Sequence, residues 1–187
     1  MSSISIIGTG NMASTLAALA VAGGNTVEVI GRDQPKAAEL AKTLGGGTTA
    51  GEFGAVPAGD IVIVALGYAN VVPVVIQYGD ALAGKVVVDP TNPLDFTTLD
   101  SLVPAGSSAA AELAVRLPGA QVVKAFNTVF AAVLASGTIG ARPHLLHGAF
   151  RRGDDQSRRG RLRDVDSFMH EELAVAQVSG VDAHPEF

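Results

Sequence analysis

The fold is decided by the stretch Ser3-Ile4-Ser5-Ile6-Ile7-Gly8-Thr9-Gly10-Asn11-Met12-Ala13. Its first part, up to Gly8, is short, apolar and rich in Ile, which predicts a buried strand. Residues 11–22 then place Met12, Leu16 and Leu19 on one side of a helix. A strand that passes directly into a helix is the first half of a βαβ unit, the building block of parallel sheets.

The turn between this strand and helix has the pattern G-x-G-x-x-A, formed by Gly8, Gly10 and Ala13. In such turns the first glycine permits a tight bend, the second lets the backbone approach a pyrophosphate, and the third small residue packs the helix on the strand. The helix N-terminus also offers N–H groups and partial positive charge to an anion. We therefore predict dinucleotide binding by residues 8–12; the alternative is a turn with a purely structural role.

The same alternation of strands and helices continues to about residue 141. Strands are predicted at 26–31, 60–66, 85–89 and 120–125, and helices at 34–44, 68–82, 107–116 and 126–135. Residues 45–59 contain six glycines and read mainly as a loop, in which a short strand can lie at 48–50. The expected fold is α/β, a doubly wound parallel sheet of the Rossmann type over residues 1–141.

The second predicted strand ends in Gly31-Arg32, where an NAD site usually has an acidic residue that holds the ribose 2′-hydroxyl. Arg32 can grip a 2′-phosphate, and Lys36, one helical turn later, adds a second charge. NADP(H) is therefore the expected cofactor. Asp33 complicates the interpretation, because it can also cap the following helix.

Further candidate residues follow later strands, at the same carboxyl edge of the sheet where open α/β folds bind ligands. Ala65 and Leu66 end the strand at 60–66, Gly67 and Tyr68 follow it, and Gly67 is small enough for backbone to approach a cofactor. Asn92 follows the strand at 85–89. Its side chain can hydrogen-bond the nicotinamide end of the cofactor, or can simply form a turn before proline.

Composition narrows the class of protein. The net charge is −5 and the chain has no cysteine, with an isoelectric point of about 5.2. An acidic chain is a poor general binder of nucleic acid or of anionic membranes. No apolar run approaches the roughly 20 residues that cross a bilayer. We expect a cytoplasmic protein whose partners are small-molecule cofactors, with no nucleic acid, membrane or metal site.

Several motifs occur together in one order: the glycine turn, Gly31-Arg32, Ala65-Leu66-Gly67-Tyr68, Asp89-Pro90-Thr91-Asn92-Pro93-Leu94 and Lys124-Ala125-Phe126-Asn127-Thr128. Over about residues 3–140 they resemble the NADPH-dependent coenzyme F420 reductase family. The N-terminal fold also looks like that of pyrroline-5-carboxylate reductase and of the ferric-reductase domains of STEAP proteins. The last two motifs are the most discriminating, since many families share the glycine turn.

The resemblance implies hydride transfer between NADPH and the deazaflavin F420, which bind face to face. It places the pyrophosphate and nicotinamide against Thr9, Gly10, Asn11 and Met12, and the acceptor near Asn127 and Thr128. The family often has Ser or Thr where this chain has Gly31. No catalytic side chain is predicted, because transfer between two cofactors needs orientation more than an acid or base. The alternatives are another acceptor (flavin, imine or quinone-like) or a non-catalytic NADP sensor.

Residues 142–187 differ from the rest. They hold all four His and seven of the 13 basic residues, and few apolar ones between 151 and 166. We expect an Arg-rich, poorly ordered tail, in which His144 and His147 are only a weak metal candidate. Two origins stay open: a genuine divergent tail, or a shifted reading frame near residues 140–144, which resequencing would test. A homodimer is one way for such a short chain to close its site.

Overall fold

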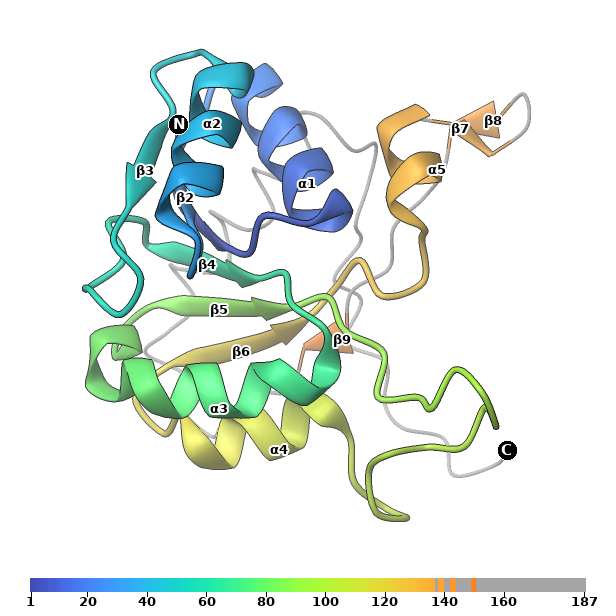
Figure 1. The fold of residues 1–187 in the computed structure, drawn as a ribbon. Coiled ribbons are helices and arrows are strands. Elements are labelled where there is room, and N and C mark those ends of the chain that lie inside the picture. Colours follow the sequence, from blue (N-terminus) through green and yellow to red (C-terminus); the bar gives the residue numbers. More distant parts are fainter. Residues whose placement is uncertain (137, 140–141, 144–148, 151–187) are drawn as a thin grey trace.

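The computed structural model describes residues 1–136, 138–139, 142–143 and 149–150. Figure 1 shows a central sheet with helices on both faces. The helices are α1 (Asn11–Ala22), α2 (Gln34–Leu44), α3 (Tyr68–Tyr78), the short η1 (Gly79–Leu82), α4 (Ala109–Arg116) and α5 (Ala131–Ser136). The strands are β1 (Ser3–Ile7), β2 (Thr26–Ile30), β3 (Thr49–Gly51), β4 (Ile61–Val64), β5 (Val86–Asp89), β6 (Gln121–Lys124), β7 (Thr138–Ile139), β8 (Arg142–Pro143) and β9 (Ala149–Phe150).

The strand order confirms the doubly wound fold. Among the described residues the main sheet runs β3-β2-β1-β4-β5-β6-β9. In this sheet the pairs from β3 to β6 are all parallel, and β9 pairs antiparallel with β6. A separate two-stranded sheet pairs β7 antiparallel with β8. The direction of winding reverses between β1 and β4, the switch point beside which such sheets bind ligands.

The strands alternate their side chains between two apolar layers. Ile4, Ile6, Ile61 and Ile63 belong to the layer that also contains residues of α1, α2 and α5. The other layer holds residues of β4 and β5 together with α3, η1 and α4. Because both faces are covered, the central strands β4 and β5 are apolar at every position before Asp89, which is why they read as continuous runs in the sequence.

Three predicted helices are shorter than expected. The helix predicted at 107–116 begins at Ala109, because Ser108 is its N-cap. The helix predicted at 126–135 begins only at Ala131, because Phe126 is in the left-handed region (φ 65°) and turns the chain after β6. The helix predicted at 68–82 ends at Tyr78, where Gly79 has φ 47° and a 3₁₀ turn follows. Pro73 lies inside α3 without ending it. The short strand predicted at 48–50 is present as β3, one residue later.

Most of the region after residue 136 lies outside the described residues. The prediction that the Arg-rich tail is poorly ordered and the weak metal candidate at His144 and His147 both concern residues outside this description. No helix in the described part is long and apolar enough to cross a membrane.

Candidate functional site

The glycine turn after β1 lies against the end of β4. Gly8 has φ 135°, and a Cβ on it would be 2.3 Å from the carbonyl oxygen of Ala65. Its N–H donates to the carbonyl of Ile30, at the end of β2, over 2.8 Å. Gly8 therefore joins the carboxyl ends of three strands, and no larger residue fits there. This contact brings the predicted cofactor residues 8–12 beside 65–68, at the switch point.

Gly10 differs from Gly8, because a Cβ on it would meet nothing within 4 Å. It is exposed and lies at the N-cap of α1 with φ −86°, a conformation open to any residue. The fold itself therefore does not require glycine at position 10. A glycine that leaves open space at a helix N-terminus fits close approach by a ligand phosphate.

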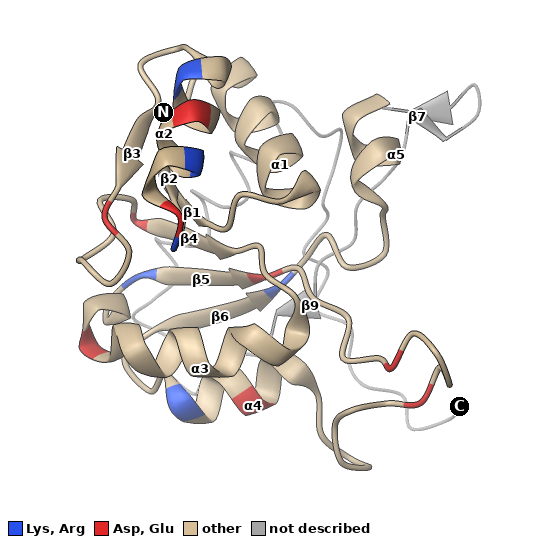
Figure 2. Ribbon diagram, in the orientation of Figure 1, with Lys and Arg blue, Asp and Glu red and all other residues tan. Residues whose placement is uncertain are grey.

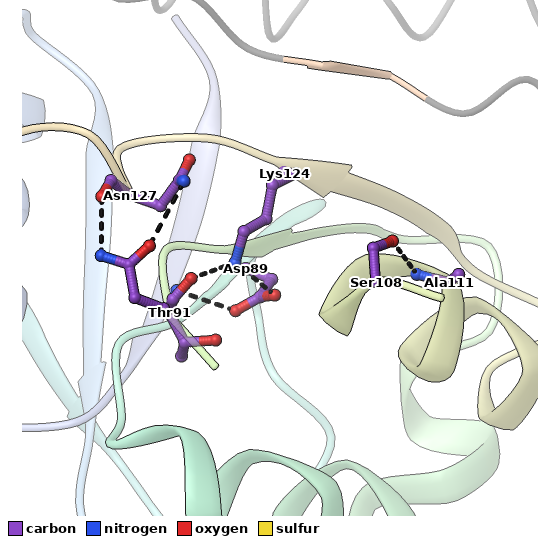
Figure 3. Close-up of polar contacts among 7 residues, drawn as sticks. Asp89, Thr91, Ser108, Ala111, Lys124 and Asn127 are labelled. Atoms are coloured by element: carbon purple, nitrogen blue, oxygen red, sulfur yellow. Dashed lines mark hydrogen bonds and ion pairs between the residues drawn. The ribbon is translucent and has the colours of Figure 1, made fainter. Parts of the chain in front are cut away.

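The two helices that begin at the switch point lack side-chain caps. Neither Gly10 at the start of α1 nor Gly67 at the start of α3 offers one, and neither first turn has an acidic residue. By contrast, α2 and α4 are capped: Asp33 accepts from the N–H of Lys36 at α2, and Ser108 accepts from the N–H of Ala111 at α4. Figure 3 shows the Ser108 cap. The uncapped, positively polarised ends thus occur where an anion is predicted.

Arg32 and Lys36 lie where β2 passes into α2, and both are exposed. Figure 2 shows the basic segments of this region beside an acidic one. The acidic residue is Asp33, whose side chain accepts from the Lys36 N–H over 3.1 Å. Asp33 therefore acts as the helix cap, and the two cations stay available for a phosphate.

At position 31 this chain has Gly where the family it resembles often has Ser or Thr, and the side chain of Thr9 lies next to this position. A Cβ at Gly31 would be 2.8 Å from the Cγ2 methyl of Thr9, so Thr9 fills the space that a side chain at position 31 would need. The two positions are coupled: a bulky residue fits at one of them, in the present geometry, only if the other is small.

This coupling predicts the outcome of a double-mutant cycle. Gly31→Ser alone should lower stability by about 1–3 kcal/mol and weaken NADPH binding, because the new side chain displaces Thr9. Adding Thr9→Ala should recover most of both losses. Thermal unfolding and NADPH titration of the four proteins measure the interaction term. Strictly additive effects would show that the packing between positions 9 and 31 is unimportant.

A pair of asparagines links the loops that follow β5 and β6. The Asn92 side-chain amide donates to the carbonyl oxygen of Asn127 over 2.8 Å, and its Oδ1 accepts from the Asn127 side chain at 3.4 Å. Both residues are partly exposed, and Thr128 beside them is exposed. The structure thus brings together the residue predicted for the nicotinamide and those predicted for the acceptor.

Beneath the asparagine pair lies an ion pair to which sequence reasoning assigned no role. Asp89, the last residue of β5, is fully buried, and its Oδ2 lies 2.9 Å from Nζ of Lys124, the last residue of β6. Figure 3 shows the Lys124 side chain reaching toward Asp89 and Thr91. A carboxylate and a lysine that end two neighbouring apolar strands are the signal that could have revealed the pair. Removing one partner of such a pair typically costs about 3–5 kcal/mol.

Tyr78 is a structural residue of the described fold. Burial raises the pKa of its hydroxyl above the usual range, against the lowering effect of the hydrogen bond from the Gly54 N–H. Its ring also packs edge-on against Phe53. The neutral phenol therefore holds the loop before β4 and is not poised to transfer a proton at neutral pH. Within the described ranges no group of three or more His, Cys, Asp or Glu could hold a metal.

Comparison with known proteins bears on this arrangement. Residues 3–93 match the family described as NADP oxidoreductase, coenzyme F420-dependent. These residues of the chain are therefore similar to that family. The match spans the glycine turn, Arg32, Lys36, residues 65–68 and Asn92, and it confirms the resemblance for the motifs up to residue 93. The family is one of NADP-dependent oxidoreductases, and the residues described above fit NADP(H): uncapped helix ends, open space at Gly10 and two available cations.

Three individual proteins are similar to this chain. Metalloreductase STEAP3 of Rattus norvegicus is 33% identical over 134 residues; the alignment covers 72% of this chain but only 26% of STEAP3. A hypothetical protein of Sinorhizobium meliloti is 28% identical, with 92% and 82% of the two chains covered and a TM-score of 0.77. A proposed F420-dependent NADP reductase of Arthrobacter is 21% identical, with 91% and 81% covered and a TM-score of 0.71. The last of these supports the fold alone.

Proposed function

We propose that this protein binds NADPH across the carboxyl edge of its sheet and transfers a hydride between NADPH and coenzyme F420. The observation that carries the proposal is the pair of uncapped, glycine-initiated helix ends at the switch point, with Gly10 leaving open space there. The domain over residues 1–141 is the proposed catalytic unit.

The pyrophosphate would lie at the N-terminus of α1. Gly8 fixes the turn, Gly10 leaves room for the phosphates, and the backbone N–H groups of Asn11 and Met12 supply donors and positive polarity. Thr9 packs against Gly31 and shapes the path toward the ribose. Ala65, Leu66, Gly67 and Tyr68 would form the facing side, because the glycine turn lies against Ala65.

Arg32 and Lys36 would hold the 2′-phosphate. The Arg32 guanidinium can form two charge-assisted hydrogen bonds to a phosphate, and Lys36 adds a point charge from the first turn of α2. Asp33 would repel this phosphate if its carboxylate faced it, but that carboxylate accepts from the Lys36 N–H. These residues favour NADPH over NADH.

Asn92 would orient the nicotinamide, and Asn127 with Thr128 would meet the acceptor. With both cofactors bound, NADPH would give up a hydride from nicotinamide C4 to become NADP⁺, and F420 would accept the hydride at deazaflavin C5 and a proton from the medium at N1. The chain's own task is to align the two ring systems and keep water out. Residues 1–141 contain neither His nor Cys. This composition suits a reaction in which both reactive centres belong to cofactors.

The test is oxidation of NADPH by the purified full chain, with and without F420, followed by absorbance. We expect turnover that requires F420 and is slower with NADH. Tight NADPH binding with turnover only on a flavin, an imine or a quinone-like acceptor would replace F420 in the proposal. Binding without turnover on any acceptor would favour an NADP sensor. Absence of NADPH binding would overturn the cofactor assignment itself.

We also propose that the protein is cytoplasmic and that two copies of the chain associate. The second of these rests on exposed apolar side chains. Phe96, Leu99 and Phe130 follow β5 and β6 and are largely exposed, so the acceptor side carries apolar surface that another subunit or the acceptor itself can cover. Sedimentation with and without NADPH and F420 distinguishes these two occupants.

A further inference from the structure

The buried ion pair joins the strand ends that carry the two asparagines. Asp89 and Lys124 are direct partners in the parallel register of β5 and β6, and each is the last residue of its strand. Replacing a buried ion pair by apolar residues is often neutral or even favourable for stability. The pair is therefore weak evidence for a role in stability, and its position at the ligand edge points to a role in geometry.

Lys124 also holds the loop after β5. Besides its contact with Asp89, its Nζ donates to the carbonyl oxygen of Thr91. The N–H of Thr91 in turn donates to Asp89 Oδ1 over 2.9 Å. These three hydrogen bonds close a ring through β5, the start of its loop and β6. The backbone at Thr91 is thus fixed from both its N–H and its carbonyl.

The two asparagines come shortly after the residues of this ring along the chain. Asn92 is the next residue along one loop, and Asn127 lies three residues after Lys124 on the other. Between Lys124 and Asn127, Phe126 is buried in the left-handed region, with φ 65°. Thr91 Oγ1 is buried without a hydrogen-bond partner in the described part of the chain. Strain and an unsatisfied hydroxyl indicate that the loops are held where the ring places them, at some energetic cost.

We propose that Lys124 is a positioning residue: with Asp89 it sets the separation of the two loops, so that Asn92 and Asn127 present their amides to nicotinamide and acceptor in a fixed relative orientation. This inference rests on the proposed function. It assigns Lys124 no contact with the reacting atoms. Its effect on the reaction is transmitted through the Thr91 backbone to the asparagine pair.

The decisive variant is the double substitution Asp89→Asn with Lys124→Met. The amide oxygen introduced by Asp89→Asn can still accept from the Thr91 N–H, and no unpaired charge is left buried. This protein should therefore fold even if Lys124→Met alone does not. Lys124→Arg should retain most activity, because a guanidinium can serve both acceptors. The matched control is Lys85→Met. Lys85 precedes the same strand as Asp89 at its other end, and its Nζ donates to the Gly59 carbonyl over 2.8 Å.

Three measurements on the full chain test the proposal. Side-chain amide NMR signals of Asn92 and Asn127 should shift in the double variant and not in Lys85→Met. The Kd for NADPH should stay within about twofold, because the residues assigned to its phosphates make none of the three hydrogen bonds of the ring. The kcat with F420 should fall about 10- to 100-fold, since small misplacements of aligned groups have effects of that size.

The outcomes separate this inference from the proposed function. Unchanged amide signals, or a kcat equal to that of Lys85→Met, would overturn the positioning role. A loss of thermal stability with normal kcat per folded molecule would also overturn it, because that is the result expected of a purely structural pair. If the wild-type chain binds NADPH but does not reduce F420, the proposed acceptor fails, and the amide signals alone then decide the role of Lys124.

Discussion

Gly10→Val is expected to leave the protein folded and to remove most NADPH binding. A Cβ at this position meets no protein atom within 4 Å, and the backbone is extended there, so the fold should lose only about 1 kcal/mol from the poorer helix cap. Branched methyls would instead occupy the space assigned to the pyrophosphate. We expect at least a ~100-fold increase in the Kd for NADPH, equivalent to about 2.7 kcal/mol. Fluorescence titration measures it; the chain has no Trp to interfere.

Two controls make this result specific. Ala18→Val adds a branched side chain on the exposed side of the same helix and should leave NADPH binding unchanged. Gly8→Val should instead destabilise the fold, because its Cβ would lie 2.3 Å from the Ala65 carbonyl oxygen in a conformation that valine resists. If Gly10→Val bound NADPH as tightly as the wild type, the pyrophosphate could not lie at this turn.

Arg32→Ala is expected to weaken NADPH binding about 10- to 100-fold while leaving NADH binding nearly unchanged. A hydrogen bond to a charged group contributes about 1.5–3 kcal/mol, and only NADPH carries the 2′-phosphate. Because Arg32 is exposed, salt screens its charge, and we expect the loss of NADPH affinity to lie nearer ~10-fold than ~100-fold. Parallel titrations with the two cofactors at two ionic strengths measure the change in preference.

Lys42→Ala is the matched control, since Lys42 is an exposed cation in the last turn of α2, the helix that Arg32 precedes. It should not alter the preference. Equal losses for NADPH and NADH in Arg32→Ala would mean that Arg32 contacts the adenosine and not the phosphate. An unchanged Kd for both cofactors would remove Arg32 from the site.

Much of the fold could be predicted because the strands are buried on both faces. Residues 60–66 and 85–89 are so apolar that only a covered parallel sheet accommodates them. The position of the switch point could be predicted from the glycine turn, because close contact with Ala65 leaves no room for a side chain at Gly8. Local patterns succeeded wherever a single steric or burial requirement governs the sequence.

The rest depends on contacts between residues distant in the chain. Nothing near Phe126 in sequence indicates a left-handed conformation, because glycine or asparagine is the usual choice there. The turn is held by tertiary contacts of the buried ring, so a helix was predicted in its place. The pairing of Asp89 with Lys124 likewise requires knowing that β5 and β6 are neighbours in register.

The order of strands in the sheet has a consequence for the lifetime of the protein. The proposed ligand residues follow β1, β2, β4, β5 and β6, which become neighbours only when the parallel sheet is assembled. Partially opened molecules therefore lack the complete site. Because NADPH would bind only the assembled sheet, it would lower the fraction of opened molecules by mass action. Resistance to proteolysis should rise with NADPH concentration. The supply of reduced cofactor would then govern how much of this protein a cell retains.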